Sequence, residues 1–98
     1  MASTPEAKVK KRVKEILATT GAYYVMPVTG GFGNSGIPDI LCCYKGRFIG
    51  IECKANGGKP TRLQLSHLEE IERNGGLSFI IDEHNVNNLK QLITDGTK

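Results

Sequence analysis

Two apolar runs joined by a two-residue turn constrain the fold of this chain more than any other feature. Residues 39–44 and 47–54 are rich in Ile, Leu, Cys and Phe, and Lys45-Gly46 separates them. This spacing predicts a tight β-hairpin in which the glycine supplies positive φ. Pro38 has no N–H to donate, which suits the first position of the hairpin. Because both strands are apolar, we expect them at the centre of a sheet that is covered on both faces.

The hairpin also brings charged side chains to one end of the sheet. Asp39 begins the first strand, and Glu52 and Lys54 end the second. Side chains alternate along a strand, so Glu52 and Lys54 share a face and Cys53 points to the other. Two carboxylates beside an ammonium suit a hydrolytic metal site, and hard oxygen ligands favour Mg²⁺ or Mn²⁺. The backbone carbonyl of Ile51 or Cys53 would complete the ligand set.

A structural explanation competes with this metal site, because each half of the pattern is short. In that alternative Asp39 is a turn residue, and Glu52 and Lys54 are an ion pair at a strand end, which contributes little to stability when exposed. The predicted helices on either side favour the functional interpretation, because one brings an acid and the other a glutamine.

The segment before the hairpin predicts an amphipathic helix. Thr4-Pro5-Glu6 combines an N-cap, a proline at the first helical position and an acid near the positive end of the helix dipole. The helix should run to about Thr19 and end at Gly21. At about 100° per residue, Glu6 falls on the same side as the apolar stripe. The stripe consists of Val9, Val13, Ile16 and Leu17.

The other segments predict two more strands and two more helices. Thr61-Arg62-Leu63-Gln64 is a capping box at the start of a helix that carries Leu65, Leu68 and Ile71. The expected ranges are 22–28 for a strand, 61–73 for this helix, 77–81 for a strand, 86–93 for a last helix and 94–98 for a frayed tail. The order is αβββαβα, an α/β fold with a mixed sheet flanked by helices, in one domain spanning residues 1–98.

A glycine-rich segment, Gly30 to Gly36, precedes the hairpin. It lacks the GK[ST] sequence of a Walker phosphate loop, which argues against nucleotide triphosphate binding. Two interpretations stay open: a connector between strands, or a loop whose backbone approaches a ligand closely.

Composition narrows the classes of function. The 98 residues are 39% hydrophobic and carry a net charge of +3. No apolar run approaches the roughly 18 residues of a membrane span, and the first residues lack the apolar core of a signal peptide, so the expected compartment is the cytoplasm. The three cysteines, Cys42, Cys43 and Cys53, have no CxxC spacing, which favours free buried thiols over a zinc site.

Taken together, these motifs resemble the PD-(D/E)xK nuclease superfamily and, within it, the small stand-alone VRR-NUC domains of phages. The resemblance covers about residues 5–82 and is carried by Glu6, by Gly36-Ile37-Pro38-Asp39-Ile40, by residues 44–54 and by Gln64. It implies a restriction-endonuclease-like core and a Mg²⁺- or Mn²⁺-dependent endonuclease. A phage-encoded member would act in the cytoplasm of the host cell.

The resemblance also implies residue roles. Asp39, Glu52 and Glu6 would bind the ion, Lys54 would serve catalysis, and Gln64 would assist. For Gln64 the capping role competes with the site role, because one side chain would have to do both. The implied assembly is a homodimer whose paired sites cut a four-way (Holliday) junction symmetrically. Three alternatives stay open: a less selective nickase or flap nuclease, an inactive DNA-binding module, and a purely structural dimeric interaction domain.

DNA binding would rest mainly on phosphate contacts, because the chain has no base-reading motif. The candidates are Lys8, Lys11, Arg12, Lys45, Lys59 and Arg62. Lys59 and Arg62 are favoured, since they follow the strand that carries Glu52. Relatives often have a basic residue just before the Pro-Asp pair, so Lys45 or Arg62 would supply that charge in this chain.

Overall fold

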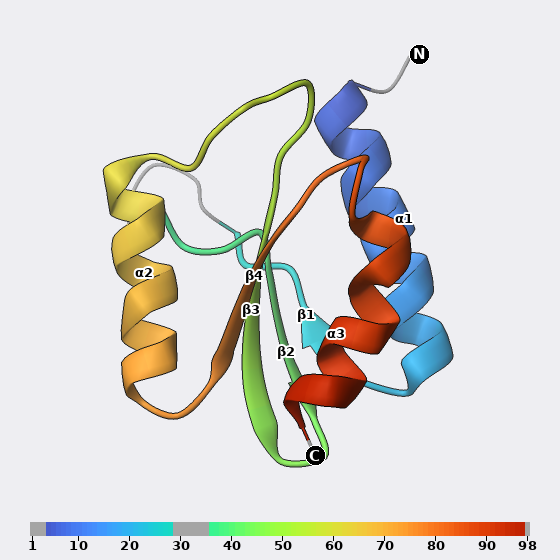
Figure 1. The fold of residues 1–98 in the computed structure, drawn as a ribbon, viewed down its shortest axis with the longest axis vertical. Helices are drawn as coiled ribbons and strands as arrows, with labels where there is room; N and C mark the ends of the chain where they lie inside the picture. Colours follow the sequence, from blue (N-terminus) through green and yellow to red (C-terminus); the bar gives the residue numbers. More distant parts are fainter. Residues whose placement is uncertain (1–3, 29–35, 98) are drawn as a thin grey trace.

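Residues 4–28 and 36–97, which the computed structural model describes, form a four-stranded sheet between helices (Figure 1). The strands follow sequence order across the sheet, and the last two are parallel while the other pairs are antiparallel. The strands are β1 (Tyr23–Val25), β2 (Ile40–Tyr44), β3 (Arg47–Cys53) and β4 (Leu77–Ile81). The predicted mixed sheet is therefore confirmed, and the hairpin strands β2 and β3 are its centre.

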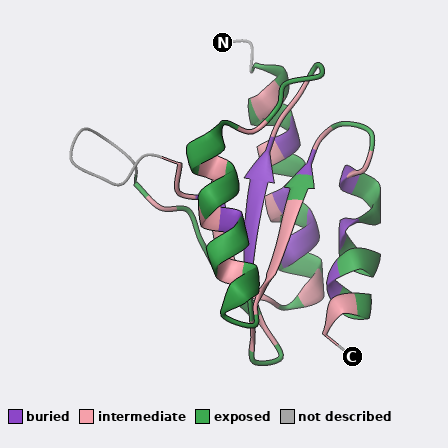
Figure 2. Ribbon diagram, turned by 60° about the vertical axis from the view of Figure 1, so that its left-hand side comes forward, coloured by how far each residue is buried: buried purple, intermediate pink, exposed green. Residues whose placement is uncertain are grey.

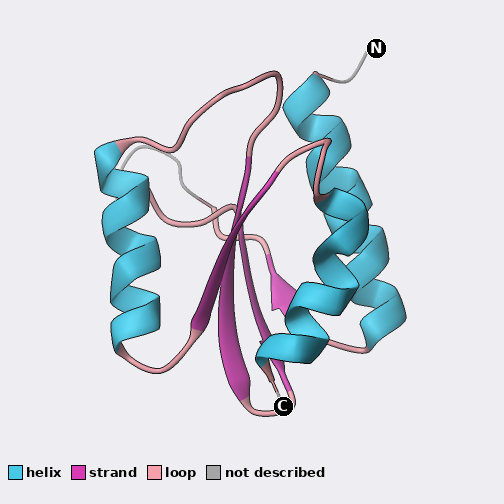
Figure 3. Ribbon diagram, in the orientation of Figure 1, coloured by secondary structure: helices cyan, strands magenta, loops and turns pink. Residues whose placement is uncertain are grey.

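Helices lie on both faces of this sheet (Figure 3). Helix α1 (Pro5–Thr20) and helix α3 (Leu89–Gly96) pack side by side on one face, and α2 (Arg62–Arg73) lies on the other. The predicted αβββαβα order is confirmed. Of the glycine-rich segment, only Gly36 falls within the described residues, so the prediction for residues 29–35 lies outside them.

Local sequence signals explain where the main elements begin and end. The Thr4 hydroxyl accepts a hydrogen bond from the Ala7 N–H at 3.1 Å and caps α1, which ends at Gly21 with φ of 80°. The hairpin turn has positive φ at both Lys45 and Gly46, the backbone that lets a two-residue loop follow the twist of its strands. The cap, the helix end and the turn agree with the sequence-based predictions.

The core fills the space between the sheet and the pair α1 and α3. The predicted α1 stripe is buried, and residues of β2, β3 and α3 pack against it. The fully buried members include Leu17, Ile40, Ile49, Ile51, Ile81, Leu89 and Ile93. No described helix has the length and apolar character that crossing a bilayer requires.

The opposite face of the sheet is only partly covered, which corrects two predictions. Helix α2 lies on β3 and β4, and a Cβ on Gly50 would come within 2.5 Å of the Ile71 side chain. At the edge of α2, Phe48 lines a hollow with Ile71 but is still 48% exposed, and Cys43 is exposed. In Figure 2, α2 is coloured mostly as exposed and β3 mostly as buried. Full coverage of the hairpin and burial of all three thiols were wrong predictions.

Two element boundaries also differ from the predictions. Strand β1 is shorter than 22–28, because its partner β2 begins at Ile40 and pairing ends at Val25 opposite Leu41. At the other end of the chain, a short 3-10 turn, η1 (Val86–Asn88), leads into α3, which continues to Gly96. Residues 94–96 are therefore helical instead of frayed.

Candidate active site

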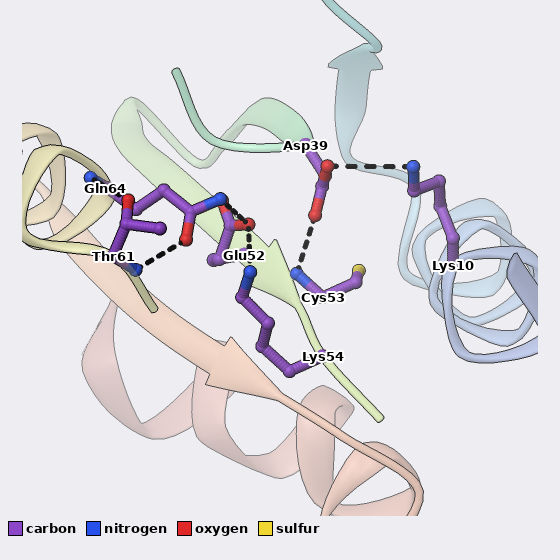
Figure 4. Close-up of polar contacts among 7 residues, drawn as sticks. All are labelled: Lys10, Asp39, Glu52, Cys53, Lys54, Thr61 and Gln64. Atoms are coloured by element: carbon purple, nitrogen blue, oxygen red, sulfur yellow. Dashed lines mark hydrogen bonds and ion pairs between the residues drawn. The ribbon is translucent and has the colours of Figure 1, made fainter. Parts of the chain in front are cut away.

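The register of the hairpin places the two carboxylates side by side. Ile40 pairs with Ile51 across the antiparallel strands, so Asp39, one residue earlier, stands next to Glu52, one residue later. Figure 4 shows both side chains at this end of β3, with groups from α1 and α2 directed toward them. The site therefore lies at the end of the sheet opposite the Lys45-Gly46 turn.

Asp39 is held by contacts from two elements. Its Oδ2 atom accepts a hydrogen bond from the Cys53 N–H at 2.8 Å, which fixes the carboxylate against the end of β3. Its Oδ1 atom lies 3.5 Å from Nζ of Lys10 on α1. The contact that Cys53 makes in the site is thus through its N–H, while the ligand role of its carbonyl stays a prediction.

Glu52 is the buried member of the pair, with a side chain that is only 2% exposed. Its Oε2 atom accepts a hydrogen bond from Nε2 of Gln64 at 2.8 Å and lies 3.5 Å from Nζ of Lys54. Its Oε1 atom is buried and has no hydrogen-bond partner among the described residues. A buried carboxylate oxygen without a partner is costly, so this atom is the clearest sign of a missing ligand.

The pKa of Glu52 also indicates that this carboxylate has fewer partners among the described residues than its burial requires. Burial of Glu52 and the neighbouring charge of Asp39 together raise the pKa of Glu52 to about 7, although Lys54 acts in the opposite direction. A carboxyl group in this setting favours a bound proton or a bound cation over the bare anion. The alternative to the metal site was an exposed ion pair between Glu52 and Lys54. The two side chains are only 2% and 14% exposed, so the pair is not an exposed one.

Gln64 both caps α2 and contacts Glu52. Its Oε1 atom accepts from the Thr61 N–H at 2.8 Å, while the Thr61 hydroxyl accepts from the Gln64 N–H, which completes the predicted capping box. Its Nε2 atom donates to Glu52. The expected competition between capping and the site was wrong, because the two ends of one amide serve the two roles. Because the cap holds Oε1 at the Thr61 N–H, the Nε2 end of the amide faces Glu52.

The residues present fit a hard divalent cation held by two carboxylates. Glu52 Oε1 has no hydrogen-bond partner within residues 4–28 and 36–97, and Asp39 lies beside Glu52 on the same edge of the hairpin. The expected third carboxylate is not assembled: among the described residues no group of three His, Cys, Asp or Glu side chains is close enough to hold an ion. The charge of Glu6 reaches the site region, since it contributes to the raised pKa of Cys53.

Helix α1 presents Lys10 to Asp39, and sequence reasoning did not select Lys10 for the site. Residues 6 and 10 are one turn apart on a helix, which separates them by about 6 Å along the axis and about 40° around it. With Lys10 at Asp39, Glu6 lies one turn further toward the start of α1. The same helical phase that selected Glu6 therefore also selects Lys10, and this signal was available in the sequence.

Thiol chemistry is disfavoured at this site. Cys53 is fully buried in the core, and burial together with the nearby Asp39 charge raises the pKa of its thiol to about 12. The thiolate, which is the nucleophilic form, is therefore scarce at neutral pH.

The predicted DNA-binding residues lie in three places. Lys59 and Arg62 are exposed in and just after the segment that leaves β3 at the site. Lys45 is at the far end of the hairpin, about 17 Å or more from Glu52 along the strand, so it is not brought to the Pro-Asp pair. Three further candidates, Lys8, Lys11 and Arg12, are exposed on α1, where Arg12 also pairs with Glu15.

Comparison with known proteins rests on structure, because no family model and no curated protein matches the chain. A solved structure titled "VRR_NUC domain" superposes with a TM-score of 0.72 and 24% sequence identity, over 91% of this chain and 97% of that one. The chain has the fold of a VRR-NUC domain. A second structure, titled "VRR_NUC domain protein", has a TM-score of 0.63 and 16% identity, over 97% of this chain and 89% of the other. The VRR-NUC fold thus extends over nearly the whole chain.

Proposed function

We propose that this protein is a metal-dependent endodeoxyribonuclease that hydrolyses phosphodiester bonds in branched DNA, with four-way junctions as the favoured substrate. The observation that carries the proposal is the buried Oε1 of Glu52, which has no hydrogen-bond partner in the described part of the chain and lies beside Asp39 and Lys54. The titles of the two similar structures, both of which name a VRR_NUC domain, support a nuclease.

In this proposal Asp39 and Glu52 hold Mg²⁺ or Mn²⁺, and the Cys53 carbonyl is a further ligand. The bound ion supplies Lewis-acid chemistry, which polarises a phosphate oxygen and lowers the pKa of water. Hydrogen bonds from the Cys53 N–H and from Gln64 orient the two carboxylates. The Lys54 ammonium, which is 14% exposed beside Glu52, offsets the charge that develops on the phosphate.

The proposed DNA contacts use the exposed basic residues at the site end of the sheet. Lys59 and Arg62 are the favoured phosphate contacts, and Lys8 and Lys11 on α1 extend the basic surface. Binding of this kind is sequence-tolerant and weakens as salt rises. A homodimer with two such sites would match the two-fold symmetry of a four-way junction.

The test is cleavage of labelled DNA with Mg²⁺ or Mn²⁺. Asp39→Asn, Glu52→Gln and Lys54→Ala should each lower the cleavage rate by about a hundredfold or more, since each removes charge stabilisation of the transition state. Lys90→Ala is the matched control, because Lys90 is exposed on α3 and lies outside the site. Circular dichroism checks that every variant is folded. Parent-like cutting by the three site variants would refute the metal site.

Substrate selectivity is tested by comparing four-way, flap and linear duplex DNA at one salt concentration. Preferential cutting of the four-way junction is expected. Equal cutting of all three substrates would replace the junction assignment with the less selective nickase or flap nuclease. Tight binding without any cutting in Mg²⁺ or Mn²⁺ would instead identify an inactive DNA-binding module.

A further inference from the structure

The site contains a second lysine, Lys10, in addition to Lys54. Lys10 comes from α1, on the other side of the site from Gln64, and points toward Asp39 in Figure 4. Its Nζ atom lies 3.5 Å from Asp39 Oδ1, and the two side chains are 31% and 21% exposed. This contact crosses between elements 29 residues apart, so it is a feature of the packed fold and not of the local sequence.

The carboxylate oxygens of Asp39 and Glu52 differ in the partners they already have, and Lys10 is paired with one of them. Asp39 Oδ2 accepts a hydrogen bond from the Cys53 N–H, whereas Oδ1 faces the Lys10 ammonium. Glu52 Oε2 is taken by Gln64 and Lys54, which leaves Oε1. Glu52 Oε1 and Asp39 Oδ1 are therefore the oxygens that the Cys53 N–H, Gln64 and Lys54 leave open to a divalent ion, and the Lys10 ammonium is paired with Asp39 Oδ1.

The contact is of a kind that a divalent ion can displace. A partly exposed ion pair at this distance contributes little to stability, because water screens it. A divalent ion carries twice the charge of the ammonium and would bind both carboxylates at once. The lysine stem is flexible, so its ammonium can leave Asp39 without moving α1.

We propose that Lys10 is the resident counter-ion of Asp39, which a divalent ion must displace in order to bind. The inference rests on the proposed function, since it concerns the same site. Lys10 is a positioning residue in this account: it neutralises Asp39 before the ion arrives and thereby weakens the apparent affinity for the ion.

The test is Mn²⁺ binding measured by isothermal titration calorimetry, with no DNA present. Lys10→Met removes the ammonium but keeps most of the stem, and it should tighten the dissociation constant for Mn²⁺ by about three- to fivefold, because the weakly paired competing cation is gone. Lys90→Met is the matched control, since it changes the net charge equally from an exposed position on α3, and its affinity should stay within about twofold of the parent. Asp39→Asn should abolish binding in the parent and in Lys10→Met.

A thermal readout checks the same point independently. Saturating Mn²⁺ should raise the melting temperature of Lys10→Met more than that of the parent, each measured against its own EDTA baseline. An unchanged or weaker affinity of Lys10→Met would overturn the counter-ion role, and so would equal tightening by Lys10→Met and Lys90→Met. If the parent binds Mn²⁺ and only the Lys10 effect is absent, the proposed function survives. If the parent binds no Mn²⁺, both proposals fail.

Discussion

At the scale of the single residue, Glu52 gives the metal-free protein a defined dependence on pH. Its pKa is about 7 in the fold, against an ordinary value of 4.5. The folded state therefore binds more protons than the unfolded state between these values, and the free energy of unfolding falls as pH rises through this range. The lost stability is regained only if a cation replaces the proton.

Glu52→Gln should remove this dependence. In EDTA at pH 8 the variant should be more stable than the parent by roughly 1–3 kcal/mol, because no buried carboxylate has to ionise. At pH 5 the two proteins should differ much less. Urea denaturation at both pH values gives the measurement, and Glu15→Gln, an exposed acid, serves as the control. If the free energy of unfolding changed between pH 5 and pH 8 by the same amount in the parent and in Glu52→Gln, the raised pKa of Glu52 would be contradicted.

The three cysteines should differ in reactivity. Burial and the neighbouring Cys43 raise the pKa of the Cys42 thiol to about 11, and Cys53 is buried as well. In protein dilute enough to be monomeric, we expect an aromatic disulfide reagent at pH 8 to modify Cys43 rapidly and the two buried thiols only after unfolding. Cys43→Ser should abolish the rapid phase. A rapid phase that survives in Cys43→Ser would show that a buried thiol is accessible.

At the scale of the element, α2 links helix capping to the site through Gln64. Gln64→Glu keeps an acceptor for the Thr61 N–H, because glutamate also forms capping boxes. It replaces the donor to Glu52 with a second carboxylate, which should raise the pKa of Glu52 further. The variant should be close to the parent in stability at pH 5 and less stable by about 1–2 kcal/mol at pH 8 in EDTA.

Gln64→Ala separates the two roles, because it removes the side-chain half of the capping box as well as the contact with Glu52, while the Thr61 hydroxyl keeps the backbone N–H of residue 64. It should be destabilised at both pH values, by about 1 kcal/mol or more. Urea denaturation of both variants at pH 5 and pH 8 measures the difference. If Gln64→Glu loses the same stability at both pH values, the side chain acts only as a cap.

The sequence predicted most elements because their signals are local. The Thr4 cap, the Lys45-Gly46 turn and the Thr61 capping box each depend on residues within one turn of chain. The predictions were wrong where contacts between distant parts of the chain determine the structure. The length of β1 depends on where its partner begins, and the exposure of Cys43 depends on how far α2 reaches across the sheet.

The candidate site divides in the same way. Asp39, Glu52 and Lys54 could be predicted together because one hairpin carries them and strand alternation fixes their face. Whether α1 brings Glu6 or Lys10 to Asp39 depends on the axial position of a helix that packs from far away in sequence. Periodicity gives the face of a helix and leaves this axial position open.

At the scale of the whole molecule, the uncovered part of the sheet is where we predict the second copy of the proposed homodimer. Tyr23 is 72% exposed, Val25 42% and Phe48 48%. They surround an apolar hollow of about 180 Å³ that Leu41, Cys42 and Cys43 also line. Clustered apolar exposure of this kind is typical of protein contact surfaces.

Sedimentation velocity at micromolar concentration tests this location. The parent should sediment as a dimer, and Phe48→Asp should shift the population to monomer. Leu92→Asp is the control, because Leu92 is 37% exposed on α3, on the opposite side of the sheet. A parent that is monomeric, or a Phe48→Asp protein that stays dimeric, would contradict the predicted surface.

The hairpin that carries the two carboxylates has a consequence for the order of folding. The bond from the Cys53 N–H to Asp39 closes a segment of only 14 residues, whereas Lys10 reaches Asp39 across 29 residues. Short loops close at a lower entropic cost, so the acidic pair should form before α1 packs against it. A divalent ion present during folding would meet the pair while Lys10 is still absent, and would act as a nucleus for the hairpin.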